Sequence, residues 1–114
     1  MNIRRGEIYL VALDPVVGKE ISKTCPVLVV SNNKNNQFSG TVTILPITSK
    51  NLTRIYPFEV FLSKGSGSLP KASKVKADQI RTVDRSRLVG YIGKIKKRKL
   101  QEIERAVKVH LELL

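Results

Sequence analysis

The apolar positions of this chain fall into short runs separated by polar, turn-rich segments, a pattern typical of a β-protein. The first run, residues 7–13, is apolar at both alternating sets of positions. These side chains are Ile8, Leu10 and Ala12 on one side and Tyr9, Val11 and Leu13 on the other. Because both faces are apolar, the run predicts a central strand that is buried on both faces of a sheet.

Further strands are predicted from segments that are β-branched or alternate between apolar and polar residues. They are residues 26–31, 41–47, 56–62, 73–81 and 89–93, with predicted loops at 19–25, 32–40 and 64–70. Pro46 has no N–H to donate, so we expect it at a sheet edge or a bulge. Residues 83–88 are predicted to form one helical turn capped by Asp84.

The C-terminal segment has a different period. Between residues 97 and 114 the apolar residues recur three or four positions apart and form one stripe of a helix. They are Leu100, Ile103, Val107, Leu111 and Leu114. Many short strands followed by one helix predict a mostly β fold, a small barrel or sandwich closed by a C-terminal α-helix.

Length and composition support one folded domain over residues 1–114. The chain has 114 residues and 41% hydrophobic content, which is enough to build a core and argues against a disordered basic tail. Its net charge of +12 indicates a polyanionic partner, with nucleic acid as the first candidate. Residues 41–88 hold 9 basic and 3 acidic side chains, so the excess is not confined to a terminal tail.

The distribution of lysine suggests two basic features. Lys71, Lys74, Lys76 and Arg81 alternate with apolar residues and are predicted to form a basic row on a strand face. The densest basic run, residues 94–99, is interpreted as the solvated entry to the C-terminal helix.

Several kinds of chemistry are excluded by the residues present. The single cysteine, Cys25, rules out an internal disulfide and a cysteine-based zinc site, which fits a reducing cytoplasm. The single histidine, His110, is predicted to be structural. The sequence has no P-loop, no G-x-G-x-x-G and no carboxylate cluster with metal-ligand spacing, so we expect no cofactor. No apolar run approaches the roughly 20 residues that span a bilayer, and we expect no membrane partner.

Cleavage of RNA remains possible without any of these groups. RNA carries its own nucleophile, the 2′-hydroxyl, beside each phosphate. A protein then needs only to orient it, move a proton and stabilise charge on the phosphoryl oxygens. Aromatic residues make up only 5% of the chain, so Tyr9, Tyr91 and the phenylalanines are predicted to be core residues rather than a base-stacking surface.

Five segments, in this order, resemble the MazF/PemK family of toxin endoribonucleases. They are Arg5-Gly6-Glu7-Ile8-Tyr9, Asp14-Pro15-Val16-Val17-Gly18-Lys19-Glu20, Pro26-Val27-Leu28-Val29-Val30-Ser31-Asn32, Pro46-Ile47-Thr48-Ser49 and Asp78-Gln79-Ile80-Arg81-Thr82-Val83-Asp84. The resemblance runs from residue 4 to the C-terminal helix.

The resemblance implies an SH3-like barrel of the MazF/CcdB type that assembles as a cytoplasmic homodimer. It implies metal-independent, sequence-specific cleavage of single-stranded RNA, mainly mRNA, to 2′,3′-cyclic phosphate and 5′-hydroxyl ends. It also implies inhibition by a MazE-like antitoxin with an acidic segment.

The resemblance assigns roles to individual positions. Thr48 matches the catalytic threonine, and Ser49 follows it. Gln79 matches a residue that contacts RNA, with Asp78 and Arg81 beside it. Glu20 lies in a loop that borders the RNA channel in this family, or is an ordinary solvated carboxylate.

The chain departs from the family pattern at one position. The family places its main catalytic arginine immediately before the proline of the second strand, where this chain has Cys25. A neutral thiol has neither the fixed charge nor the bidentate fork of a guanidinium. Three explanations stay open: an attenuated or inactive variant, Lys23 as a substitute cation, or a direct role for Cys25.

Two other functions also stay open. One is a CcdB-like toxin that poisons DNA gyrase through protein contact. The other is a remnant that binds RNA without cleaving it. The Pro-Ile-Thr-Ser and Gln-Ile-Arg-Thr segments favour the ribonuclease over the gyrase poison.

Overall fold

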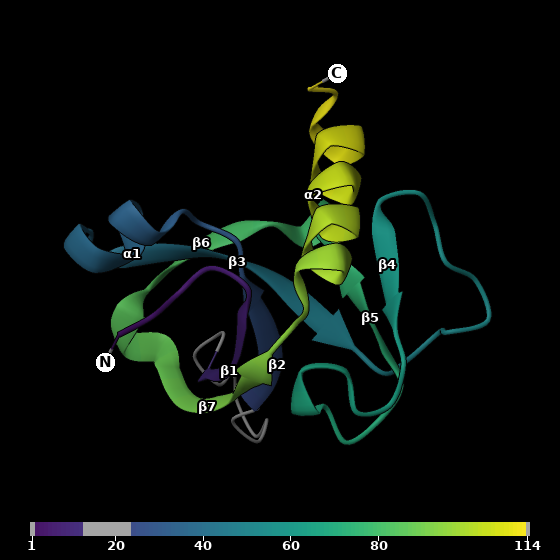
Figure 1. Cartoon of the computed structure of the whole chain (residues 1–114), viewed down its shortest axis with the longest axis horizontal. Helices are drawn as coiled ribbons and strands as arrows, with labels where there is room; N and C mark the ends of the chain where they lie inside the picture. Colours follow the sequence, from purple (N-terminus) through teal and green to yellow (C-terminus); the bar gives the residue numbers. More distant parts are fainter. Residues whose placement is uncertain (1, 13–23, 114) are drawn as a thin grey trace, which may run out of the picture.

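The computed structural model describes residues 2–12 and 24–113, which form a mostly β structure with a C-terminal helix (Figure 1). The strands are β1 (Glu7–Ala12), β2 (Thr24–Val29), β3 (Thr41–Thr48), β4 (Glu59–Leu62), β5 (Ser73–Lys76), β6 (Arg81–Asp84) and β7 (Leu88–Lys94). The helices are α1 (Asn33–Phe38) and α2 (Lys97–Leu111), with three 3-10 turns, η1 (Ser66–Ser68), η2 (Ala77–Gln79) and η3 (Arg85–Arg87).

The strands form one antiparallel sheet in the order β4-β5-β3-β2-β1-β7. β6 also pairs with β3, beside the first half of that strand, whereas β5 pairs with its end. The loop that carries η1 lies against β7 so closely that a Cβ on Gly93 would be 2.2 Å from the carbonyl oxygen of Gly67. This contact joins the β4–β5 loop to the strand at the opposite end of the sheet.

The prediction of a central first strand is confirmed. β1 lies between β2 and β7, and its residues contribute to both faces of the sheet. Ile8 belongs to the core cluster beneath α2, while Tyr9 and Val11 belong to the cluster on the other face. β2 repeats this pattern, with Leu28 in the first cluster and Val27 in the second.

The expected place of Pro46 is wrong, although the physical reason behind the expectation holds. Pro46 is in the interior of β3, opposite Val27 of β2. On its other side, β3 pairs with β6 up to Ile44 and with β5 from Ile47 onward. Pro46 therefore lies where β3 changes partner, so its missing N–H costs no bond there.

The predicted loop at residues 32–40 is also wrong, because its centre folds as α1. The Asn32 side chain caps this helix by accepting a hydrogen bond from the Asn35 N–H at 2.8 Å. Asn36 is buried and donates to the Ser31 carbonyl at 2.9 Å. These local bonds support a helix despite the turn-rich composition.

The single strand predicted at 73–81 is interrupted. It separates into β5, η2 and β6, so that both short strands pair with β3. The helical turn predicted at 83–88 is shorter in the structure, because only Arg85–Arg87 form η3. Its predicted cap at Asp84 is confirmed, since the Asp84 carboxylate accepts from the Ser86 N–H at 2.9 Å.

α2 follows the predicted apolar stripe as far as Val107 but not at Leu111, and Leu114 lies outside the described residues. Ile103 is fully buried and Leu100 and Val107 pack against the core, but Leu111 is 44% exposed. Figure 1 shows the C-terminal end of α2 extending beyond the sheet. Neither helix in the described part of the chain is long and apolar enough to cross a membrane.

The prediction that the aromatic residues are core residues is correct for Tyr9 and wrong for others. Tyr9 is buried and its hydroxyl donates to Glu7 at 2.9 Å; burial, with this bond, raises the Tyr9 pKa well above its usual range. Tyr91, Phe38 and Phe61 are exposed. Alternation along a strand indicates two faces but not which of them is covered.

Candidate functional site

A groove of about 720 Å³ lies where β2, β3, β5 and β6 meet; we call it the Thr48 groove. It is lined by Cys25, Pro46, Ile47, Thr48, Lys50, Asn51, Lys74, Lys76, Gln79 and Arg81. These residues come from four separate stretches of sequence.

Strand register explains why distant residues meet in this groove. β2 and β3 pair Val27 with Pro46, and Cys25 and Thr48, each two residues beyond this pair, line the same groove. On the other side of β3, Thr48 is opposite Lys74. Cys25, Thr48 and Lys74 therefore lie on three adjacent strands.

The groove brings together four of the residues predicted for the site: Cys25, Thr48, Gln79 and Arg81. Ser49 lines a smaller adjoining hollow that also includes Cys25 and Thr48. Glu20 and Lys23 lie outside the described residues. His110 is exposed on α2, with its ring centroid 6.4 Å from that of Phe58, and does not line the groove.

Asp78 does not line the groove, contrary to its grouping with Gln79. It is in η2 with one carboxylate oxygen, Oδ1, buried and without a hydrogen bond, 3.8 Å from the Lys76 ammonium nitrogen. Asp78 is therefore next to a residue of the groove lining, Lys76, but does not itself face the hollow.

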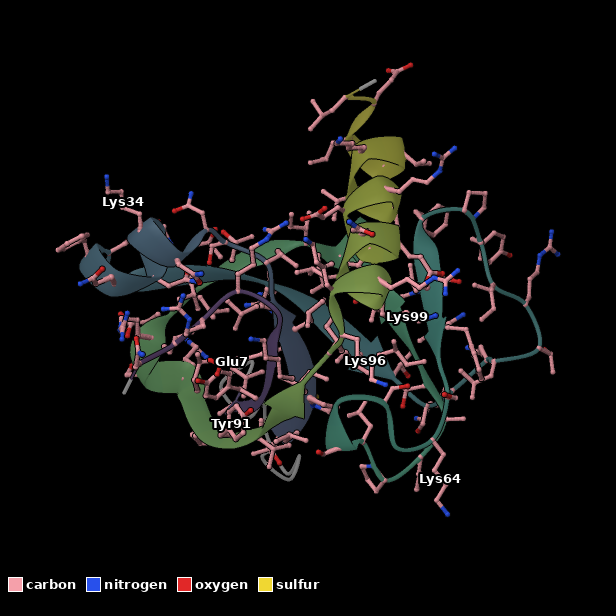
Figure 2. The ribbon with its side chains drawn as sticks, in the orientation of Figure 1. Glu7, Lys34, Lys64, Tyr91, Lys96 and Lys99 are labelled. Atoms are coloured by element: carbon pink, nitrogen blue, oxygen red, sulfur yellow. The ribbon has the colours of Figure 1, made fainter. Side chains whose placement is uncertain are left out.

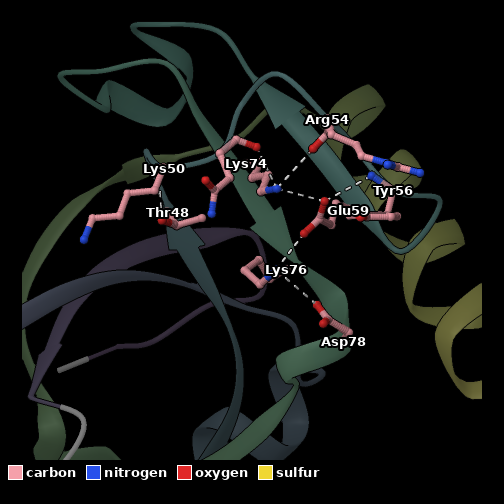
Figure 3. Close-up of polar contacts among 9 residues, drawn as sticks. Thr48, Lys50, Arg54, Tyr56, Glu59, Lys74, Lys76 and Asp78 are labelled. Carbon is pink, nitrogen blue, oxygen red and sulfur yellow. Dashed lines mark hydrogen bonds and ion pairs between the residues drawn. The ribbon is translucent and has the colours of Figure 1, made fainter.

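Thr48 contributes a hydroxyl group to the lining of the groove. It is the last residue of β3 and is half-buried. Its Oγ1 accepts a hydrogen bond from the Lys50 N–H at 3.2 Å, which orients the side chain at the turn that follows the strand (Figure 3). The hydroxyl hydrogen of Thr48 is still able to donate to an acceptor in the groove.

The described lining of the groove is cationic and contains no carboxylate. Its charged members are Lys50, Lys74, Lys76 and Arg81. Three members of the predicted basic row thus share one concave surface, while Lys71 lines the adjoining hollow. Cations, a hydroxyl and an amide around a hollow are suited to bind a phosphodiester.

A buried carboxylate lies behind the lysines, and the sequence did not indicate it. Glu59 of β4 has a side chain only 1% exposed, and it accepts from Lys74 Nζ at 3.0 Å and Lys76 Nζ at 2.6 Å (Figure 3). The Tyr56 N–H donates to it at 3.0 Å. Burial alone would raise the Glu59 pKa, but the bonds from Lys76, the Tyr56 N–H and Lys74 outweigh burial and lower it to about 2.

The Glu59 cluster also arises from strand pairing. Glu59 is opposite Lys76 in the β4–β5 register, so the two side chains meet across the sheet. In the sequence, Glu59 is a polar residue within an alternating strand, which predicts an outward, solvated side chain. Only the pairing with a lysine-bearing strand reveals its role, and Lys50 was likewise not identified from the sequence.

The densest basic run of the sequence does not belong to the Thr48 groove. Lys96 and Lys99 lie at the first turn of α2 (Figure 2) and line a different hollow with η1. Lys99 also pairs with Glu102 at 3.1 Å. This placement agrees with the interpretation of residues 94–99 as a solvated helix entry.

Comparisons with known proteins identify the family of this chain. The family model for PemK-like, MazF-like toxins of type II toxin–antitoxin systems matches residues 4–111. The endoribonuclease MazF9 of Mycobacterium tuberculosis is 39% identical, over 97% of this chain and 98% of its own length. The endoribonuclease MazF of Staphylococcus saprophyticus is 33% identical, over 97% and 92%.

Solved structures show that the fold is that of the MazF toxins, as the sequence predicted. A MazE–MazF crystal structure from Deinococcus radiodurans superposes with a TM-score of 0.84 at 27% identity, covering 100% of this chain and 99% of that one. A mycobacterial endoribonuclease in complex with its cognate antitoxin superposes with a TM-score of 0.80 at 26% identity, covering 98% and 97%.

Proposed function

Because the chain belongs to the family of PemK-like, MazF-like toxins of type II toxin–antitoxin systems, we propose that it is an endoribonuclease toxin. It cleaves single-stranded RNA, mainly mRNA, at specific sequences and without a metal ion. Its products are a 2′,3′-cyclic phosphate and a 5′-hydroxyl. The observation that carries this proposal is the Thr48 groove, where a hydroxyl, an amide and several cations converge.

The reaction needs only groups that RNA and this groove supply. The ribose 2′-oxygen bonds to phosphorus as the bond from phosphorus to the 5′-oxygen breaks. The 2′ proton passes to solvent and the 5′-oxygen takes up a proton. Negative charge gathers on the phosphoryl oxygens during this step, and donors aimed at them accelerate it.

We assign the roles by chemistry and position. The Thr48 hydroxyl donates to the scissile phosphate, and Arg81 contacts a backbone phosphate. The amide of Gln79 reads a base edge, since amides pair with two base atoms at once. Cys25 occupies the family's arginine position and contributes no fixed charge, so this chain is an attenuated ribonuclease.

The partners follow from the family and from the charge of the groove. We propose that a MazE-like antitoxin inserts an acidic segment where the RNA strand binds, and that two copies of the chain form the working toxin. The relatives supporting this are crystallised as toxin–antitoxin complexes. A cationic groove serves both ligands, so they compete.

One assay tests the proposal against its alternatives. The purified chain is incubated with a long RNA in EDTA, and the RNA is analysed by primer extension and for cyclic phosphate ends. Discrete EDTA-resistant cuts are expected. Salt-sensitive RNA binding without cuts would identify a non-cleaving binder, which the neutral thiol of Cys25 makes the main competitor. Gyrase inhibition without RNA binding would instead support a CcdB-like toxin.

A further inference from the structure

The groove needs a cation near the scissile phosphate, and its lysines differ in how free they are to supply one. An ammonium group has three N–H donors. The Lys74 ammonium donates three hydrogen bonds, to the Asn51 carbonyl at 3.0 Å, the Arg54 carbonyl at 3.2 Å and the Glu59 carboxylate at 3.0 Å. Its side chain is 4% exposed. Lys74 is therefore fully engaged and structural.

Lys76 is held at the same place but is not fully engaged. Its ammonium donates to Glu59 Oε2 at 2.6 Å and is 3.8 Å from Asp78 Oδ1, beyond hydrogen-bond distance. The side chain is 21% exposed and lines the Thr48 groove (Figure 3). Donor capacity that Glu59 does not use is thus available at the groove wall.

Glu59 cannot neutralise both lysines that it binds. One buried carboxylate is shared by two ammonium groups, so the three residues carry a net positive charge, which reaches the groove at Lys76 because Lys74 is covered. The hydrogen bond to Glu59 also raises the Lys76 pKa, which keeps this ammonium protonated. Asp78, whose Oδ1 is 3.8 Å from the Lys76 nitrogen, brings the formal charge of the four residues to zero, so what Lys76 offers the groove is the unused N–H donors of an ammonium group.

Lys50, in contrast, is not fixed by a described side-chain contact. It is exposed, and its side chain extends away from Lys74 and Lys76 (Figure 3). Fixing a long, mobile side chain on a phosphate costs conformational entropy, and Lys76 has already lost that freedom through its bond to Glu59.

We propose that Lys76 is the cation that contacts the scissile phosphate in this chain, supplying from β5 a charge that Cys25 of β2 does not offer, and that Glu59 is the residue that positions it. The inference rests on the proposed function and names the group that replaces the family's arginine. It competes directly with Lys23 as the substitute cation.

The test compares charge-removing and charge-keeping variants of Lys76. Cleavage is measured in EDTA as kcat/KM, and binding is measured by anisotropy with an RNA made uncleavable by 2′-deoxy substitution. Lys76→Met is expected to lower kcat/KM about 10²-fold or more, the size seen when one donor to a developing oxyanion is removed. It should also reduce the salt slope of binding by about 0.7, one phosphate contact on a single strand. Lys76→Arg should retain most activity.

Matched controls distinguish a phosphate contact by Lys76 from the loss of one positive charge anywhere on the protein and from a loss of folding. Lys64, which points away from the body of the protein (Figure 2) and lines no part of the groove, supplies Lys64→Met as the control for loss of one positive charge. Thermal unfolding confirms that each variant is folded. Glu59→Gln is made alone and with Lys76→Met, because a positioning residue has no further effect on cleavage once Lys76 is gone.

The outcomes distinguish this inference from the proposed function. If wild type cleaves RNA, and cleavage is unchanged by Lys76→Met but abolished by Lys23→Met, the proposed role of Lys76 is refuted. The proposed ribonuclease function is then still supported. An inactive wild-type chain overturns the ribonuclease, and the salt slopes of wild type and Lys76→Met then still decide the phosphate contact. A chain that neither binds nor cleaves RNA overturns both.

Discussion

Replacing Glu59 by glutamine should destabilise the protein in a pH-dependent way. Glutamine keeps the shape of the side chain but leaves Lys74 and Lys76 as two neighbouring ammonium groups without their shared counter-charge. Removing one partner of a buried ion pair typically costs about 3–5 kcal/mol. The pKa gives a second estimate, because a shift from 4.5 to about 2 corresponds to about 3 kcal/mol of stability.

The sign of the pH effect follows from the direction of that shift. The folded state holds the Glu59 pKa below its unfolded value, so the stabilisation is complete above pH 4.5 and is lost as the pH falls toward 2. Wild type should therefore lose about 2 kcal/mol from this group between pH 7 and pH 3. Glu59→Gln has no carboxyl to titrate at this position, so its stability should not fall through this group between pH 7 and pH 3.

Urea unfolding followed by circular dichroism, at one protein concentration, measures the free energy of unfolding of wild type and Glu59→Gln at pH 7 and at pH 3. The two proteins should differ by about 3 kcal/mol at pH 7 and by about 1 kcal/mol at pH 3. Glu102→Gln is the control, since Glu102 pairs with Lys99 at the exposed surface of α2 and should change stability by less than about 1 kcal/mol. A difference for Glu59→Gln that is equally large at both pH values would refute the reasoning.

Three further outcomes are expected. Cys25→Arg should raise RNA cleavage about 10²–10³-fold in the EDTA assay, because it restores a guanidinium to the Thr48 groove; unchanged cleavage would show that the groove does not lack this charge. Thr48→Val should lower kcat of cleavage at least about 10²-fold while RNA affinity, measured by anisotropy, changes little; an equal loss of affinity would assign the hydroxyl to binding instead. Gly93→Ala should cost about 1–3 kcal/mol in urea unfolding because its Cβ would be 2.2 Å from the Gly67 carbonyl oxygen. Gly90→Ala, whose Cβ would be 4.0 Å from Leu10, is the matched control, and equal effects of the two alanines would contradict a steric cause.

Much of the fold was predictable because local periodicity reports burial directly. The first strand is apolar on both sides and proved central, with Ile8 and Val11 in opposite core clusters. The errors arose where tertiary contacts outweighed local composition. The Asn-rich segment folds as α1 because Asn32 and Asn36 find specific partners, and the strand predicted at 73–81 breaks so that both of its parts pair with β3.

By itself, the amino-acid sequence determined the strand-rich class, the C-terminal helix, the excess of positive charge and the unusual Cys25 at the position where the family pattern has arginine. The tertiary structure decided which of the many basic residues face that threonine and which are occupied elsewhere. Lys74 and Lys76 have the same charge and lie on the same strand. The Lys74 ammonium is covered by two backbone carbonyls, whereas the Lys76 side chain is partly exposed at the groove. The reason is physical: side-chain chemistry is local, whereas Glu59 meets these lysines only through the register of strands distant in sequence.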